Sequence, residues 1–183
     1  MIAHETIQET GKVYSFEPNP ILYKRLTKNL DFNNVCNNCI CHPMGLSSKS
    51  YSAFLNLDDN HHQMGSLHTE QSDNKVKVEL ITLDSLKIPR IDGIKIDVEG
   101  HELQVIKGAL QSLKKNKPWL IIELNNLFYN ISNIKQWIVY ELLTKLGYTS
   151  NFDETTNLSK SYCRDVLFYY KRNKKLEHLP PFL

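Results

Sequence analysis

The clearest structural pattern in this chain lies at residues 91–102, Ile91-Asp92-Gly93-Ile94-Lys95-Ile96-Asp97-Val98-Glu99-Gly100-His101-Glu102. Apolar and polar residues alternate through its middle, which is the period-2 pattern of a β-strand. Gly100 interrupts this strand, and from His101 to Leu110 apolar residues recur at the spacing of an amphipathic helix. A strand, a glycine turn and a helix form one unit of an open α/β sheet, in which ligands bind outside the carboxyl ends of the strands. We therefore expect chemistry at Asp97 and Glu99.

Length and composition bound the kind of protein. The chain has 183 residues, of which 41% are hydrophobic and 23% charged, as is typical of one globular domain with a sizeable core. Its net charge of +2 argues against a nucleic-acid surface. No stretch approaches the roughly 20 apolar residues of a membrane span, and Met1–Thr10 lacks the apolar core of a signal peptide. The four cysteines are too few for a disulfide scaffold, so we expect a cytoplasmic protein without membrane or nucleic-acid partners.

Predicted strands and helices alternate along the rest of the chain. Strands are expected at Lys12–Glu17, Cys39–His42, Ser50–Leu57, Lys75–Ile81, Pro118–Leu124, Tyr148–Phe152 and Asp165–Tyr170. Met1–Thr10 is expected to be the end of a helix, and further helices are expected for about three turns from Pro20, in a short turn with Asp84 as N-cap, and at Ile131–Leu146 before Gly147. The continuous apolar run at 118–124 is typical of a strand covered on both faces. The pattern predicts a doubly wound α/β domain with an antiparallel tail.

Several of these segments together resemble a known family. They are Val13-Tyr14-Ser15-Phe16-Glu17-Pro18-Asn19-Pro20, Thr82-Leu83-Asp84, Ile94–Glu102 followed by Lys107-Gly108-Ala109, and Ile122-Glu123. Their order and spacing are similar to those of the FkbM-type S-adenosylmethionine-dependent methyltransferases. The resemblance implies the Rossmann-like class I methyltransferase fold and methylation of hydroxyl oxygens on sugars or natural products. It covers about residues 10–125 of a single domain that we expect over 1–183, with a basic, proline-containing tail at 171–183.

The resemblance places a cofactor site near Glu17. This residue follows the first predicted strand, where a carboxylate can accept hydrogen bonds from both ribose hydroxyls of an adenosyl cofactor, as an acid does in dinucleotide folds. The alternative is that Glu17 is the N-cap of the helix near Pro20, although Asp and Asn are commoner caps. The resemblance also implies that Asn19 and Met44 contribute to cofactor binding, Met44 near the adenine. For Met44, a loop of the core is the alternative.

The catalytic residues implied by the resemblance follow the central strand. Asp97 is expected beside the sulfonium of the cofactor, where a carboxylate could stabilise the cation or position the acceptor hydroxyl. Glu99 and His101 come next, and a histidine with an ordinary pKa near 6.5 could take the acceptor proton. An exposed residue at a helix start is the alternative for His101. Lys95 is expected to pair with Asp97 or Glu123, and a catalytic lysine is the second interpretation.

One feature of the family is missing from the sequence. Class I methyltransferases hold the methionine end of the cofactor on a glycine-rich loop after the first strand, but this chain contains no Gly-x-Gly. We therefore expect an N-terminally truncated domain that lacks the first strand, leaving a gap between the Glu17 and Asp97 strands. A start codon assigned too late, a decayed fragment and a non-catalytic protein whose gap another chain closes are the competing explanations.

These observations lead to alternative functions. The first is an S-adenosylmethionine-dependent O-methyltransferase acting on a small-molecule or glycan hydroxyl. The second is a catalytically inactive remnant that acts as a binding or assembly partner, in an oligomer or with a chain that covers the missing strand. A nicotinamide oxidoreductase is excluded because the Gly-x-Gly-x-x-Gly fingerprint is absent. We predict no metal site, because Cys36, Cys39, Cys41 and His42 lack the second ligand pair of a zinc motif.

Overall fold

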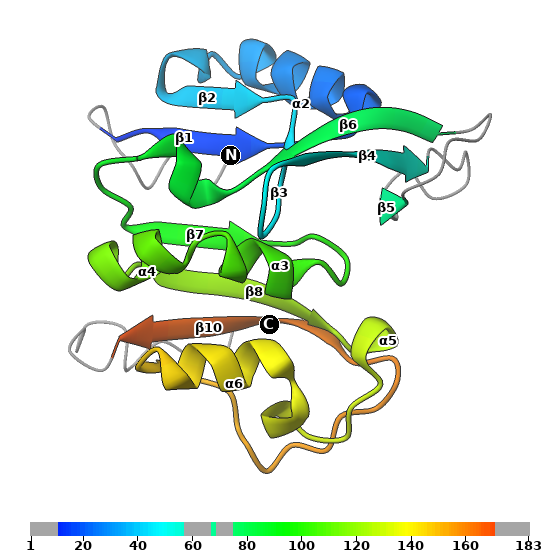
Figure 1. Ribbon diagram of the computed structural model, residues 1–183, viewed down its shortest axis with the longest axis vertical. Coiled ribbons are helices and arrows are strands. Elements are labelled where there is room, and N and C mark those ends of the chain that lie inside the picture. Colours follow the sequence, from blue (N-terminus) through cyan, green and yellow to red (C-terminus); the bar gives the residue numbers. More distant parts are fainter. Residues whose placement is uncertain (1–10, 57–66, 69–74, 171–183) are drawn as a thin grey trace. The chain divides into compact units, whose positions relative to one another are not determined.

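A computed structural model describes residues 11–56, 67–68 and 75–170 (Figure 1). The chain splits into two compact units, Met1–Ile81 and Thr82–Leu183, and each unit is described by itself. The helix end predicted at Met1–Thr10 and the tail at 171–183 lie outside the described residues.

The first unit contains a parallel pair of strands joined by a helix. Strand β1 (Val13–Phe16) pairs with β2 (Cys39–His42). Helix α2 (Pro20–Phe32) and the short 3-10 helix η1 (Cys36–Asn38) lie between them in sequence. Proline at the first helical position has a φ angle suited to a helix and lacks only an N–H that would be unpaired there. The predicted strands and the helix from Pro20 are confirmed.

A second sheet in this unit has the strand order β3-β6-β4-β5. Its strands are β3 (Gly45–Leu46), β4 (Tyr51–Asn56), β5 (Leu67–His68) and β6 (Lys75–Ile81). Its small core consists of Ala53, Leu55, Val78 and Leu80. The strands β4 and β6 were both predicted, β6 from its clear alternation, whereas β3 and β5 are too short to show a periodicity.

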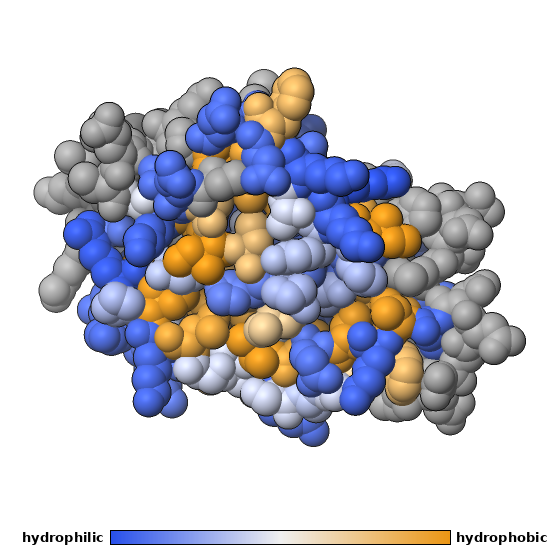
Figure 2. All heavy atoms as spheres, turned by 90° about the horizontal axis from the view of Figure 1, so that it is seen from above, coloured by the Kyte–Doolittle hydropathy of each residue, from blue (hydrophilic) through white to orange (hydrophobic). Residues whose placement is uncertain are grey.

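Helix α2 leaves hydrophobic residues at the surface. None of its residues is buried, and the side chains of Phe32 and Ile21 are 87% and 38% exposed. Figure 2 shows one face of the molecule, on which hydrophobic residues lie exposed among hydrophilic ones. The apolar spacing that predicts this helix therefore does not produce a buried helix face among the described residues.

The second unit is built on a four-stranded sheet with the order β7-β8-β10-β9 (Figure 1). Its strands are β7 (Gly93–Ile96), β8 (Trp119–Asn125), β9 (Tyr148–Ser150) and β10 (Cys163–Tyr170). Strand β7 is parallel to β8, whereas β10 is antiparallel to both β8 and β9. This confirms the predicted antiparallel tail. Among the described residues, β1 and β7 belong to different hydrogen-bonded sheets.

Short helices connect these strands. They are η2 (Leu83–Leu86), α3 (Glu102–Lys107), α4 (Leu110–Asn116), α5 (Asn126–Tyr129), η3 (Ile134–Gln136) and α6 (Ile138–Lys145). In β8, Leu120, Ile122 and Leu124 are 0% exposed, while the residues between them are half-buried. One face of this strand is therefore fully covered, as expected, and the other face is only partly covered. Apolar residues on the second face still gave the strand its continuous apolar pattern.

The predicted N-cap at Asp84 is also wrong. The Thr82 hydroxyl caps η2 by accepting the Ser85 N–H at 3.1 Å. The Asp84 carboxylate instead accepts the N–H groups of Gln111 and Ser112, at 2.9 and 2.8 Å. These donors belong to the first turn of α4, where backbone N–H groups lack partners within the helix. Asp84 therefore caps a helix that begins more than twenty residues after it.

The long helix predicted at Ile131–Leu146 is shorter in the structure. The segment begins with η3, whose Asn133 and Gln136 form a reciprocal capping box. Trp137 then has an extended conformation (φ −75°, ψ 115°), and α6 starts only at Ile138. Trp137 is 0% exposed, and burying its indole takes precedence over continuing the helix.

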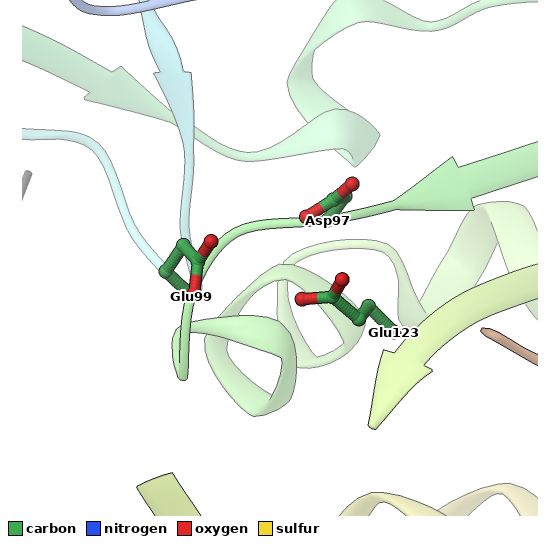
Figure 3. A group of neighbouring side chains, drawn as sticks. All are labelled: Asp97, Glu99 and Glu123. Atoms are coloured by element: carbon green, nitrogen blue, oxygen red, sulfur yellow. The ribbon is translucent and has the colours of Figure 1, made fainter. Parts of the chain in front are cut away.

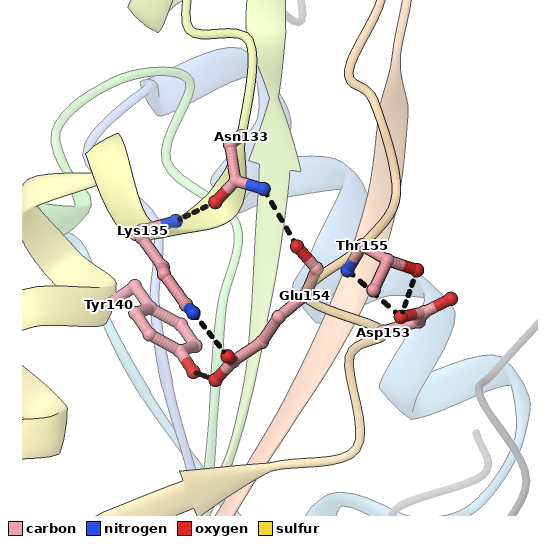
Figure 4. A network of polar contacts seen from close by, with 6 residues as sticks. All are labelled: Asn133, Lys135, Tyr140, Asp153, Glu154 and Thr155. Carbon is pink, nitrogen blue, oxygen red and sulfur yellow. Dashed lines mark hydrogen bonds and ion pairs between the residues drawn. The ribbon is translucent and has the colours of Figure 1, made fainter.

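A polar network links this region to the segment before β10 (Figure 4). The Glu154 carboxylate accepts a hydrogen bond from the Tyr140 hydroxyl and pairs with the Lys135 ammonium at 2.7 Å. The Asn133 amide donates to the Glu154 carbonyl at 2.7 Å. The side chain of Asp153 accepts hydrogen bonds from the N–H and hydroxyl of Thr155.

Among the described residues, no helix is long and apolar enough to cross a membrane.

Candidate functional site

The turn after β7 has an unusual backbone. The His101 N–H donates to the Val98 carbonyl at 3.2 Å, and this bond closes a four-residue turn. Both central residues have positive φ, 48° at Glu99 and 91° at Gly100. Glycine adopts this conformation readily, but for Glu99 it is strained. The turn places Asp97 and Glu99 directly after the strand.

Three carboxylates meet at this edge of the sheet. Asp97 and Glu99 follow β7, and Glu123 lies near the carboxyl end of the neighbouring parallel strand β8 (Figure 3). One carboxylate oxygen from each lies within 4.8 Å of the other two. The sequence predicted Asp97 and Glu99 as site residues and Glu123 as a neighbour, and the structure brings them together.

The pKa values in this cluster reflect burial and mutual repulsion. Burial raises the pKa of Glu99, and the nearby charges of Glu123, Asp97 and Glu102 raise it further, against a lowering by a hydrogen bond from Asn125. Burial and the charge of Asp97 likewise raise the pKa of Glu123. A carboxylate with a raised pKa is a stronger base than an ordinary surface carboxylate, which is suited to accepting a proton.

Such a cluster also has the oxygen ligands that a divalent cation prefers. The spacing of Asp97, Glu99 and Glu123 fits a single ion. Exposed acidic groups commonly have similar spacing without one, so this geometry alone does not assign a metal. Cys39 and Cys41, which were considered for a zinc motif, lie half-buried in the short strand β2.

Lys95 supplies a positive charge beside the carboxylates. Its ammonium nitrogen lies 2.9 Å from the Asp165 carboxylate and 3.6 Å from that of Asp97. Burial lowers the pKa of Lys95, but the hydrogen bond and charge of Asp165, with a smaller effect of Asp97, raise it above its ordinary value. The predicted pairing with Asp97 is confirmed, but the main partner, Asp165, was missed. A lysine with a raised pKa stays protonated, which argues against a catalytic base.

His101 lies half-buried at the N-cap position of α3, without a side-chain capping bond. Burial lowers the pKa of His101, and the charge of Glu102 partly opposes this. The imidazole is therefore neutral at pH 7 and able to accept a proton. It is not the fully exposed residue of the alternative interpretation.

Residues that the sequence analysis missed complete the surroundings of the cluster. Cys163 on β10 lies opposite Asn125 on β8. Burial, a hydrogen bond to Glu123 and the surrounding carboxylate charges raise the pKa of the Cys163 thiol to about 11, so it is protonated and a poor nucleophile. The Asn125 side chain caps α5 by accepting the Leu127 N–H at 3.2 Å. No local pattern around Cys163 or Asn125 signals a role at this edge.

In the first unit, the predicted cofactor residues lie after β1. One carboxylate oxygen of Glu17, Oε1, accepts the Asn19 N–H at 2.7 Å. Burial raises the pKa of Glu17, and this hydrogen bond lowers it less. A carboxylate at this position can accept hydrogen bonds from a ligand with hydroxyl donors. Glu17 is not the N-cap of α2.

Asn19 is the N-cap instead. It is 3% exposed, and its Oδ1 accepts the N–H groups of Ile21 and Leu22 at 2.9 and 3.4 Å. A buried amide whose oxygen is used in this way orders the helix start, and the cofactor contact predicted for it stays a prediction. Met44 lies half-buried between β2 and β3, next to a fully buried Gly45.

Parallel strands with acids at their carboxyl ends, joined by helices, are typical of α/β enzymes that bind a nucleotide-like cofactor. The model of the family described as methyltransferase FkbM domain matches residues 2–150. The chain therefore belongs to the methyltransferase FkbM family, as the sequence resemblance predicted.

Individual relatives agree with this assignment. The hexuronic acid methyltransferase AglP of Haloferax volcanii is 31% identical over 119 residues, which are 63% of this chain and 48% of that protein. A crystal structure of methyltransferase FkbM from Methylobacillus flagellatus KT matches with a TM-score of 0.53 and 15% identity, over 87% of this chain and 36% of that one. This likeness confirms the predicted class I methyltransferase-like α/β fold. The chain spans about half the length of the curated relative it matches.

Proposed function

We propose that this protein is an S-adenosylmethionine-dependent methyltransferase that methylates a hydroxyl oxygen of a sugar, and that 1–183 works as one methyltransferase domain. The observation that carries this proposal is the meeting of Asp97, Glu99 and Glu123 at the carboxyl ends of β7 and β8 in a member of the FkbM family. The similarity to a protein named hexuronic acid methyltransferase supports a sugar acceptor.

In the first unit, Glu17 is the residue that would hold the ribose. Its oxygen Oε1 accepts a hydrogen bond from the Asn19 N–H, and its second oxygen can accept a hydrogen bond from a ribose hydroxyl. Met44 is proposed near the adenine. When bound, S-adenosylmethionine would supply a methyl group on a positively charged sulfur, for in-line attack on the methyl carbon by the acceptor oxygen with S-adenosylhomocysteine as the leaving group.

In the second unit, the carboxylates act on the acceptor. A carboxylate beside a sulfonium stabilises the bound cofactor more than the transition state, because the positive charge disappears during the transfer. We therefore assign Asp97 to orienting the acceptor hydroxyl by accepting its hydrogen bond. The raised pKa of Glu99 and the neutral state of His101 make both of them suitable acceptors for the hydroxyl proton.

Binding of S-adenosylhomocysteine, measured by calorimetric titration, tests the cofactor part. We expect Glu17→Gln to weaken binding by about 10- to 100-fold, because a charge-assisted hydrogen bond contributes roughly 1.5–3 kcal/mol. Glu79→Gln, which changes an exposed carboxylate on β6, is the matched control and leaves binding unchanged. A folded chain that does not bind would contradict the proposal and favour an inactive member of the family acting as a binding partner.

Methyl transfer to a panel of neutral sugars and uronic acids tests the chemistry. We expect Glu99→Gln to lower kcat by at least about 100-fold, which is the usual contribution of a positioned proton acceptor. We expect Asp97→Asn to lower kcat by a similar factor, because it would orient the acceptor hydroxyl less well. S-adenosylhomocysteine affinity is the control, because neither variant changes the ribose site in the first unit. Cofactor binding without transfer to any sugar would contradict the proposed acceptor class.

A further inference from the structure

Glu102 is the most unusual carboxylate in the described part of the chain. It begins α3 and is only 1% exposed. Carboxylates are almost never buried to this extent without partners that hold their charge. The proposed reaction does not use Glu102, so its burial needs another reason.

The partners of Glu102 come from both sides of the carboxylate site. Its Oε1 accepts the Gly100 N–H at 3.0 Å, and its Oε2 accepts a hydrogen bond from the Tyr129 hydroxyl. Gly100 belongs to the turn that follows β7, and Tyr129 is the last residue of α5, which follows β8. One buried carboxylate therefore connects the segments that follow two adjacent parallel strands.

Packing fixes the position of the Tyr129 ring, and its hydroxyl stays protonated. Its ring contacts the fully buried Trp137 edge-on, with ring centroids 5.7 Å apart. Burial, and then the hydrogen bond to Glu102, raise the pKa of Tyr129, so its hydroxyl keeps its proton and always donates. Phe128 also packs on the turn, because a Cβ atom added at Gly100 would lie 3.1 Å from its ring.

The connection acts on a strained part of the backbone. Glu99 has a φ of 48°, a conformation that persists only where surrounding contacts enforce it. The hydrogen bond from the next residue, Gly100, to Glu102 is such a contact. Without it, the turn would relax, and the Glu99 carboxylate would move relative to Glu123.

We propose that Glu102 is a positioning residue, which holds the Glu99–Gly100 turn against α5 and thereby sets the place of the Glu99 carboxylate relative to Glu123. Its effect on methyl transfer rests on the proposed function, whereas its effect on the turn does not.

Amide hydrogen exchange of the whole chain, followed residue by residue, tests this role. The variants are Tyr129→Phe, which removes the donor but keeps the ring, Glu102→Ala and the conservative Glu102→Gln. The Gln amide can still accept the Gly100 N–H and donate to the Tyr129 oxygen. Glu141→Gln, which changes an exposed carboxylate on α6, is the control.

We expect the protection of the Gly100 amide to fall by about 10- to 100-fold in Tyr129→Phe and in Glu102→Ala, as for the loss of a hydrogen bond to a charged group. In Glu102→Gln the protection of the Gly100 amide is largely kept. In every variant, the protection of the Ile122 amide in the core of β8 changes less than that of the Gly100 amide. Unchanged Gly100 protection in Tyr129→Phe would overturn the proposal. A fall at Ile122 equal to that at Gly100 would do so too, because it indicates a loss of global stability only.

The same variants separate this inference from the proposed function. With an active enzyme, we expect Tyr129→Phe to lower kcat several-fold and to leave the KM for the cofactor unchanged. A wild-type chain without methyl transfer would contradict the proposed function, while the exchange measurement would still support or overturn the role of Glu102.

Discussion

The Lys95 ammonium on β7 lies 2.9 Å from the Asp165 carboxylate on β10, although β8 separates these strands in the sheet. The Lys95 side chain thus reaches across β8 on the face that also carries Glu123, since Asp165 and Glu123 are register partners. This ion pair places one positive charge at the edge of a group of carboxylates.

We expect the pairing of Lys95 with Asp165 to contribute about 0.2–1 kcal/mol to stability, because both side chains are partly exposed. A double-mutant cycle with Lys95→Met and Asp165→Asn measures this coupling by urea unfolding. The cycle is needed because Asp165→Asn also relieves the repulsion of Glu123.

The sign of the pH dependence of the Lys95–Asp165 coupling follows from the raised pKa of Lys95. The coupling is fully present below the ordinary lysine pKa of 10.5 and is lost as the pH rises through the raised value. The same cycle on the exposed pair Arg90–Asp92 is a control with a smaller coupling. A Lys95–Asp165 coupling of zero at pH 7 would contradict this prediction.

The carboxylate site lowers stability at neutral pH. The raised pKa of Glu99 means that the folded chain binds its proton more tightly than the unfolded chain does. The free energy of unfolding therefore falls as the pH rises from the ordinary value of 4.5 through the raised one. We expect Glu99→Gln to increase stability at pH 7 by less than about 1 kcal/mol, since the site is partly solvated.

Urea unfolding between pH 4 and pH 8 measures this effect, and the gain from Glu99→Gln should shrink toward the acid end. Glu141→Gln is a contrasting control, because it removes an i,i+4 pair with Lys145 and should lower stability by about 0.3–0.5 kcal/mol. A loss of stability in Glu99→Gln at pH 7 would show that repulsion does not dominate at this residue.

The N-cap of α2 gives a prediction for the first unit. Asn19→Ala removes the acceptor of the Ile21 and Leu22 N–H groups, so we expect a loss of about 0.5–2 kcal/mol. Asn19→Ser retains a capping oxygen and should lose much less. Thermal unfolding of both variants measures the difference, and equal losses would show that Asn19 acts through packing rather than capping.

The network around Glu154 predicts a late tyrosine titration. Burial, and then the hydrogen bond to Glu154, raise the pKa of Tyr140 to about 12. In an alkaline titration followed by tyrosinate absorbance, Tyr140→Phe should remove one titration near pH 12, and Glu154→Gln should lower its midpoint. Glu141→Gln, on the same helix as Tyr140, should leave it unchanged. A Tyr140 midpoint near pH 10 would contradict the hydrogen bond.

Much of the fold was predicted because the signals are local. The alternation in Lys75–Ile81 and the motif from Ile94 to Glu102 reflect the two-residue repeat of a strand, which neighbouring side chains alone produce. The helix from Pro20 was predicted from apolar residues at helical spacing, which is also a local pattern. The acids Asp97, Glu99 and Glu123 were found because residues at the carboxyl ends of adjacent parallel strands must lie near one another.

The contacts that shape the site join residues far apart in sequence, and no local pattern reports them. Lys95 and Asp165 are 70 positions apart, and Glu102 and Tyr129 are 27 apart. Lys95 was expected to pair with Asp97 or Glu123, but the antiparallel register of β10 placed Asp165 closer to its ammonium than Asp97. Local periodicity therefore predicted the strands and the acids at their ends, and the resemblance of the motifs predicted the family. Strand order and register, which depend on packing of the whole sheet, decided the partners of those acids.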